Sequence, residues 1–202
     1  MNYIFVGKFD PPHYGHIETI KEGIKKAIAP KHIILESEFS FFEEDDLLIC
    51  IGSANSHLST AYQCLFNYKQ RRDFLSSWLH LIGVYGYTIV PLPDMNNLDL
   101  WLDLINDLYE SHFKHWNMKE NCTFISGLED DISFFAEKGF KTEILIPRNE
   151  GKLYNSTSIR KVLLDKTLSD NEKFESICNS IDVFIAEKVM EEYNKIIGDI
   201  NE

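Results

Sequence analysis

The feature that most constrains this chain is an apolar run that ends at a glycine and leads through two prolines into a helix. Residues 3–6 predict a short buried strand, and Gly7 permits a tight exit from it. Pro11 and Pro12 prevent the strand from continuing, and an amphipathic pattern begins near Ile17. The chain is therefore expected to pass from a strand into a helix through a short loop.

Two histidines, His13 and His16, lie at the start of this expected helix. A helix N-terminus carries unpaired N–H groups and the positive end of the macrodipole, which favour an anion. Side chains three positions apart share a helix face, so both rings can face one phosphate chain. The alternative is a strand, a proline loop and a helix with incidental histidines, which a lone histidine would favour. The stretch predicts a site for the phosphates of a nucleotide.

Short apolar runs and helical patterns alternate along the rest of the chain, which is typical of a parallel α/β sheet. The expected strands are residues 3–6, 33–35, 47–51, 87–91, 122–126 and 142–146. The expected helices are residues 14–29, 69–82, 98–115, 129–138 and 156–164, with a helical tail over 170–193. These elements predict a Rossmann-like doubly wound parallel sheet with C-terminal helices. We expect a main domain over residues 1–165 and a helical extension of it over 166–202.

The formal net charge of the 202 residues is −12. This charge argues against a nonspecific nucleic-acid binder, whose affinity comes from neutralising backbone phosphates. A small polyanionic substrate needs only a local positive pocket, which Lys8, Arg71 and Arg160 could supply together with the histidines. The acidic surplus is interpreted as solvated surface.

Neither the start of the sequence nor its apolar runs indicate membrane insertion. The first residues contain no basic segment followed by a long apolar run. No uninterrupted apolar stretch of the sequence approaches the ~20 residues that span a bilayer. The four cysteines form no Cys-x-x-Cys pair and are expected to be buried free thiols. These features predict a soluble cytoplasmic protein that does not bind a membrane.

Further polar residues follow the expected strands, where a doubly wound sheet binds its ligands. Gly52 and Ser53 would let a ligand approach the backbone, although a simple strand-ending turn is the alternative. Arg71 lies near the start of a helix, where its guanidinium suits phosphate, although many surface arginines have no specific role. Asp94 could accept hydrogen bonds from a substrate amide or ribose, and Trp101 could stack on a ring or belong to the core.

Two hydroxyl-bearing segments occur later in the chain. Ser126 and Gly127 end an expected strand, where backbone groups could meet a nucleobase. The hydroxyls of Ser156, Thr157 and Ser158 stand at a helix start, one turn before Arg160. Any of the serines could simply cap the helix, but hydroxyls clustered with an arginine also form a polyphosphate clamp.

Two of these segments resemble the bipartite signature of the nucleotidyltransferase superfamily. Gly-Lys-Phe-Asp-Pro-Pro-His-Tyr-Gly-His, residues 7–16, resembles the first signature, Gly-x-Phe-x-Pro-x-His-x-Gly-His. Tyr-Asn-Ser-Thr-Ser-Ile-Arg, residues 154–160, resembles the second, Ser-Thr/Ser-x-x-Ile-Arg. The ordered set over residues 3–164 most closely resembles the archaeal-type nicotinamide mononucleotide adenylyltransferases.

The resemblance implies adenylyl transfer from ATP to the 5′-phosphate of nicotinamide mononucleotide, which gives NAD and pyrophosphate. It implies Mg²⁺ that bridges phosphates with few or no direct protein ligands, and a homo-oligomer. The implied catalytic residues are His13, His16 and Arg160. The implied ATP-binding residues are Gly7, Lys8, Phe9, Asp10, His13, His16, Ser126, Gly127, Ser156, Thr157, Ser158 and Arg160. The implied acceptor-binding residues are Gly52, Ser53, Arg71, Asp94 and Trp101.

The sequence departs from the archaeal pattern at two positions and leaves other functions open. Lys8 replaces an arginine, and Leu128 replaces an asparagine. Three alternatives remain. The acceptor could be nicotinate mononucleotide, phosphopantetheine or flavin mononucleotide, the donor could be CTP, or the protein could be a catalytically weak nucleotide sensor. Asp94 with Trp101 favours a pyridine ring, and a carboxylate there disfavours the anionic nicotinate. Residues 36–46 are interpreted as a hairpin-like insertion or flap.

Overall fold

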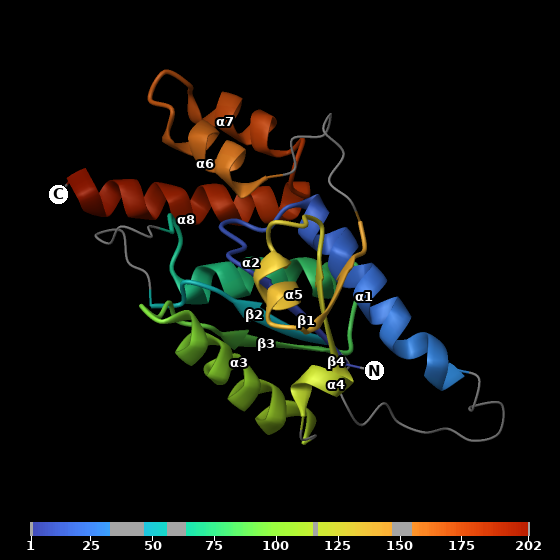
Figure 1. Ribbon diagram of the computed structural model, residues 1–202. Coiled ribbons are helices and arrows are strands. Elements are labelled where there is room, and N and C mark those ends of the chain that lie inside the picture. The colour runs from blue at the N-terminus through green and yellow to red at the C-terminus, as the bar shows by residue number, and fades with distance from the viewer. Residues whose placement is uncertain (1, 33–46, 56–63, 115–116, 147–154, 202) are drawn as a thin grey trace.

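The computed structural model describes residues 2–32, 47–55, 64–114, 117–146 and 155–201. The strand expected over residues 33–35 and the insertion expected over 36–46 lie outside these ranges. The resulting fold is shown in Figure 1.

In the described ranges, five parallel strands form one sheet in the order β3-β2-β1-β4-β5. The strands are β1 Asn2–Gly7, β2 Leu47–Ile51, β3 Tyr87–Pro91, β4 Cys122–Ser126 and β5 Lys141–Ile144. This order confirms the predicted Rossmann-like doubly wound α/β fold. The chain runs outward from β1 to β3 on one side and continues through β4 and β5 on the other, so the topological switch point lies between β1 and β4.

Eight helices surround the sheet in the described part of the chain. They are α1 Tyr14–His32, α2 Tyr68–Leu81, α3 Leu98–Phe113, α4 Met118–Asn121, α5 Ser133–Glu137, α6 Ser156–Leu164, α7 Asp170–Ile177 and α8 Val183–Asn201. The helical tail expected over 170–193 consists of two helices, because residues 178–182 between α7 and α8 are not helical, and it continues to Asn201. Asp182 begins the new helix by accepting a hydrogen bond from the N–H of Phe184 at 2.9 Å.

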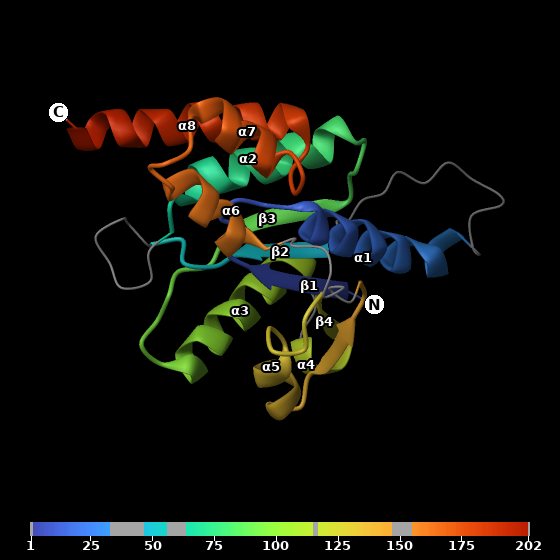
Figure 2. The same cartoon turned by 90° about the horizontal axis from the view of Figure 1, so that it is seen from above.

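The sheet is buried between two helical layers, which Figure 2 shows from above. Phe5 and Ile49 belong to the core that α1, α2 and α8 cover, whereas Ile4 and Leu48 belong to the core under α3, α4 and α5. Successive side chains of a strand point to opposite faces, so both faces of these apolar strands are buried. This packing fixes the carboxyl ends of the strands at one edge.

The C-terminal helices join the core on the α2 side of the sheet. Gln70 of α2 donates to Glu192 of α8 at 2.6 Å, and Lys188 donates to Ser77 at 2.8 Å. Ile181, between α7 and α8, is fully buried in the same core as Phe5. No helix in the described ranges is both long and apolar enough to cross a lipid bilayer.

The cysteines are free thiols in the structure, as expected from their spacing. Burial raises the pKa of the Cys50 thiol to about 12 and raises that of Cys122 further. Because the thiolate is the reactive form, a disulfide reagent should modify only the half-buried Cys178 rapidly in the native protein. Titration with such a reagent should then find four thiols after unfolding without reductant. Fewer than four would reveal a disulfide.

Candidate active site

A cavity of about 380 Å³ opens at the carboxyl edge of the sheet, where the switch point lies. Its wall combines residues of the exits from β1, β2 and β3 with residues from α1, α3, α6 and the segment after β4. The lining residues are Phe5, Val6, Gly7, Lys8, Phe9, His13, His16, Gly52, Ser53, Asp94, Trp101, Asp131, Asn155, Ser156, Thr157 and Arg160. The motifs that sequence analysis singled out thus converge on one site, as a doubly wound sheet requires.

The loop after β1 places its aromatic residue under the histidines. Phe9 has a positive φ of 51° and is fully buried, with its ring 4.6 Å from that of His16 between centroids. A Cβ at Gly7 would lie only 3.0 Å from the Phe9 ring. Glycine at this position therefore gives the Phe9 ring the room to pack beneath His16.

His13 and His16 are buried and stacked, with ring centroids 3.8 Å apart. The backbone N–H of His13 donates to Nδ1 of His16 at 3.3 Å, and that of Gly15 donates to Nδ1 of His13 at 3.1 Å. A backbone N–H can only donate, so each Nδ1 must be unprotonated. The hydrogen-bond network thereby assigns the proton of each neutral ring to Nε2. Both rings at the cavity are hydrogen-bond donors suited to phosphate oxygens.

The start of α6 is attached to the loop after β1. Ser156 Oγ donates to the carbonyl of Pro11 at 2.8 Å, and Arg160 donates to the carbonyl of Asp10 at 2.7 Å. Asn155, not one of the serines, caps the helix by accepting the N–H of Ser158 at 2.7 Å. The hydroxyls of Ser156 and Thr157 are therefore not needed as caps, and both residues line the cavity beside Arg160.

Asp10 was expected to bind ATP, but its fully buried carboxylate faces the protein instead. It accepts the N–H groups of Leu65 and Phe66 at 2.9 and 3.0 Å. Burial raises the pKa of Asp10, while these two hydrogen bonds and the charge of Arg160 oppose the increase. The carboxylate thus ties the loop to the segment that enters α2 and does not line the cavity.

On the opposite wall, Asp94 is held by neighbours from the loop after β2. Ser53 Oγ donates to Asp94 Oδ1 at 3.1 Å, and Asn55 bonds both the N–H and the carbonyl of Asp94. Oδ2 of Asp94 has no hydrogen-bond partner among the described residues. Trp101, in the first turn of α3, packs against Phe135 at 5.9 Å between centroids and still lines the cavity. Together they present a fixed carboxylate oxygen beside an indole.

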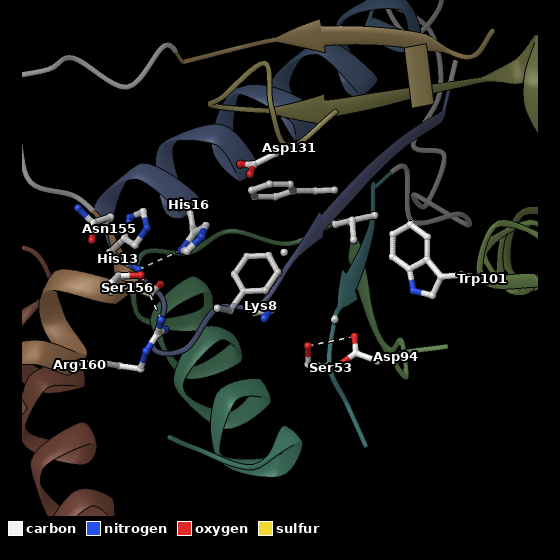
Figure 3. A pocket seen from close by; sticks show the side chains of 16 residues that line it. Lys8, His13, His16, Ser53, Asp94, Trp101, Asp131, Asn155, Ser156 and Arg160 are labelled. Atoms are coloured by element: carbon white, nitrogen blue, oxygen red, sulfur yellow. Dashed lines mark hydrogen bonds between the residues drawn. The ribbon is translucent and has the colours of Figure 1, made fainter. Parts of the chain in front are cut away.

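Figure 3 shows these two groups at opposite sides of the cavity. His13, His16, Ser156 and Arg160 lie on one side, Ser53, Asp94 and Trp101 on the other, and Lys8 lies between them. The cavity therefore has a cationic, hydrogen-bond-donating end and an end with a carboxylate and an aromatic ring.

Five residues expected at the site do not line the cavity: Asp10, Arg71, Ser126, Gly127 and Ser158. Arg71 was expected to reach phosphate, but its guanidinium is fully buried and, among the described residues, donates to backbone carbonyls. Ser126 is also buried, and its hydroxyl donates to Asp131 at 3.1 Å while accepting the N–H of Leu128. The side chains of Arg71 and Ser126 thus bond to residues of the cavity wall.

Sequence reasoning missed four lining residues: Phe5, Val6, Asp131 and Asn155. Asn155 carried a readable signal, because asparagine immediately before a run of hydroxyl residues is a favoured helix cap. Asp131 lies in an acidic run that follows Ser126 and Gly127, and the sequence gives no sign that this run lines a cavity. In the structure the chain turns after Gly127, so that Asp131 accepts a hydrogen bond from Ser126.

The side chains of the cavity limit how it could hold a metal ion. The described residues contain no group of three or more His, Cys, Asp or Glu side chains that could hold one. Two carboxylates line the cavity, Asp94 in the segment after β3 and Asp131 in the segment after β4, and each accepts a hydrogen bond from a serine. This donor set fits an Mg²⁺ ion that substrate phosphates hold, and not an ion in a protein cage.

A family model described as cytidylyltransferase-like matches residues 4–162, which is well over half of the 202-residue chain. The chain belongs to the cytidylyltransferase-like family. This membership makes the protein a nucleotidyltransferase and confirms the superfamily that the two signatures indicated. The match spans the loop after β1 and most of α6, which together carry the histidines and Arg160 of the cavity.

Relatives of this nucleotidyltransferase carry two different names. A nicotinamide-nucleotide adenylyltransferase of Picrophilus torridus is 29% identical over 164 residues, which are 81% of this chain and 80% of the relative. One of Pyrococcus horikoshii is 26% identical over 80% of this chain and 72% of the relative. A "probable nicotinate-nucleotide adenylyltransferase" of Campylobacter jejuni is 25% identical over 88% of this chain and 92% of the relative.

Solved structures support the fold of this nucleotidyltransferase. A bifunctional NMN adenylyltransferase/ADP ribose pyrophosphatase from Francisella tularensis superposes with a TM-score of 0.61 at 20% identity. The match covers 98% of this chain, which spans about half of that protein, 53%. The Plasmodium falciparum nicotinic acid mononucleotide adenylyltransferase gives a TM-score of 0.54 at 14% identity, over 95% of this chain and 96% of its own.

Proposed function

We propose that this nucleotidyltransferase transfers the adenylyl group of ATP to the 5′-phosphate of nicotinamide mononucleotide, forming NAD and releasing pyrophosphate. The observation that carries the proposal is the two-ended cavity, with imidazole, ammonium and guanidinium donors facing a carboxylate and an indole. A triphosphate fits the donor end, and a pyridine ring with a carboxamide fits the other. The relatives named as nicotinamide-nucleotide adenylyltransferases support the same reaction.

The chemistry requires alignment and charge stabilisation, not a protein nucleophile. The ionised 5′-phosphate of the acceptor attacks the α-phosphorus of ATP, one phosphoanhydride bond forms, and the bond to pyrophosphate breaks. Good alignment of two bound reactants alone contributes roughly 7–11 kcal/mol. Lys8, Arg160 and the two Nε2–H groups are the donors that would bind the triphosphate and stabilise charge on the transferring group.

Magnesium, when bound, neutralises phosphate charge and draws the phosphate oxygens into one geometry. We propose that the ion would be held mainly by the substrate phosphates, because the described residues contain no group of three or more metal-ligating side chains. The protein contributes the shape of the cavity and the donors that face the same phosphates.

Asp94 supports the amide as the preferred acceptor. Its Oδ1 accepts from Ser53, and none of the described residues donates to Oδ2, which can therefore accept an N–H of a carboxamide. Nicotinate mononucleotide would place a second carboxylate there, and two like charges in contact disfavour binding. The second candidate is nicotinate mononucleotide itself, which the Campylobacter relative's name favours.

The deciding experiment measures pyrophosphate release with ATP or CTP against a panel of acceptors. The panel comprises nicotinamide mononucleotide, nicotinate mononucleotide, phosphopantetheine and flavin mononucleotide. We expect the highest kcat/KM with ATP and nicotinamide mononucleotide, and identification of NAD as product by chromatography. A preference for nicotinate mononucleotide would establish the second candidate.

Turnover with neither pyridine nucleotide would refute the proposal. Calorimetric binding of ATP or NAD without pyrophosphate release from any acceptor would instead identify a nucleotide sensor.

A further inference from the structure

A single buried arginine connects the two ends of the cavity without lining it. Arg71 in the first turn of α2 donates through one terminal nitrogen to the carbonyls of Lys8 and Gly52, at 2.7 and 2.8 Å. Its other terminal nitrogen donates to the carbonyl of Ser53 at 2.9 Å. The planar guanidinium thus joins the exit of β1 to the exit of β2, and only a rigid fork of donors can hold three carbonyls in this way.

The three carbonyls belong to residues that carry the cavity-facing groups. Lys8 stands between the two ends of the cavity, and its backbone leads into the loop that places Phe9 under His16. Ser53 has a positive φ of 52°, a strained value for a side chain with a Cβ, and its hydroxyl orients Asp94. The guanidinium therefore contacts the backbone of both substrate-facing loops at once.

A reciprocal contact fixes α2 against the loop after β1. Asp10 in that loop accepts the N–H groups of Leu65 and Phe66, immediately before the α2 cap at Asn67, while Arg71 of α2 donates back to Lys8. Burial raises the pKa of Asp10, and the charge of Arg71 is among the effects that oppose this increase. Each of the two buried side chains thus links the loop to the segment that carries α2.

Stability alone does not account for this arrangement. Nε of Arg71 is buried and has no hydrogen-bond partner in the described ranges, and burying a charge carries a desolvation cost that an apolar residue would avoid. The neighbours Phe74 and Leu75 already anchor α2 on the sheet with fully apolar, buried side chains. The burial of this guanidinium is therefore best explained by its hydrogen bonds to the backbone of the two loops.

We infer that Arg71 is a positioning residue that sets the separation and orientation of the triphosphate loop and the acceptor loop. This inference rests on the proposed reaction for its kinetic readout, and on ATP binding for an independent one. It gives the arginine a role distinct from the phosphate contact that its sequence position suggests.

The test compares Arg71→Ala, Arg71→Lys and the control Arg72→Ala, since Arg72 is the next residue of α2 and is exposed. Both Arg71 variants should lower kcat about 30-fold, measured well below each variant's Tm, whereas R72A should leave it within twofold. Guanidinium chloride at tens of millimolar should restore kcat of R71A at least fivefold, against sodium chloride at equal ionic strength. It should not rescue R71K, whose side chain occupies the site.

Several outcomes would overturn the inference. One is activity of R71A that falls only in proportion to its unfolded fraction; another is kcat of R71K within threefold of the unsubstituted protein. If R71A does not fold, the kcat of R71K alone decides: a value within threefold of that of the unsubstituted protein overturns the inference. If the unsubstituted protein has no activity with any acceptor, the proposed reaction fails separately, and calorimetry with ATP then decides. A Kd for ATP that both Arg71 variants leave unchanged would refute the positioning role.

Discussion

Replacing His16 with alanine is expected to lower turnover about 100- to 1,000-fold, the usual loss when one donor to a developing charge is removed. The backbone N–H of His13 assigns the His16 proton to Nε2, the position from which the ring can donate to a phosphate oxygen. Arg160→Ala should cause a loss of the same order, because its guanidinium belongs to the same wall. Steady-state kinetics with ATP and nicotinamide mononucleotide measure both effects.

The matched control is His80→Ala, which removes an exposed histidine near the end of α2. It should change neither kcat nor Tm appreciably. His16 is buried against Phe9, so its alanine variant should lose some stability, and circular dichroism must show that it is folded at the assay temperature. If H16A and R160A lose folding and catalysis in parallel, the two residues are structural.

Replacing Asp94 with asparagine is expected to reverse the choice between the amide and acid forms of the acceptor. The substitution would remove the charge-assisted hydrogen bond that we propose between the Asp94 carboxylate and the carboxamide. Such a bond is worth about 1.5–3 kcal/mol, so kcat/KM for nicotinamide mononucleotide should fall roughly 10- to 150-fold. Removal of the negative charge also ends the repulsion of nicotinate. The ratio of kcat/KM for the two mononucleotides should therefore move by about 100-fold or more toward the acid.

The control here is Asp99→Asn, an exposed carboxylate in the first turn of α3 that pairs with Lys138 outside the cavity. It carries the same chemical change on a neighbouring element and should leave the ratio unchanged. Equal responses of D94N and D99N would show that the effect is general electrostatics. An unchanged ratio in D94N would place the amide elsewhere.

Local patterns predicted much of the fold because they reflect local physical causes. The run at Leu47–Ile51 is apolar at every position, and the strand it forms is buried on both faces. The start of α6 follows from the capping asparagine and the helical pattern after it. The motifs converge because parallel strands end at the same edge of the sheet, so a topology predicted from alternation also predicts one site.

The sequence could not reveal which way long-range contacts turn a side chain. Arg71 looks like any arginine near a helix start, and only the packing of α2 on the sheet turns its guanidinium inward to the carbonyls of Lys8, Gly52 and Ser53. The carboxylate of Asp10 is likewise turned away from the cavity because it accepts hydrogen bonds from N–H groups more than fifty positions away. The break between α7 and α8 was readable, because Asp182 is a favoured helix-capping residue.

The hydrogen bond from Ser156 to Pro11 joins residues 145 positions apart, so the wall that we propose for the triphosphate is complete only when α6 packs against the loop after β1. Contacts between residues this distant in sequence carry an entropic cost of loop closure. An intermediate in which α6 to α8 are detached would retain the sheet's first strands but lack the α6 residues of the proposed triphosphate wall, such as Ser156 and Arg160. Because a ligand stabilises only the states that bind it, ATP would select the fully assembled chain over such intermediates. In a nucleotide-rich environment, the substrate would thus also protect this enzyme from proteolysis at its C-terminal helices.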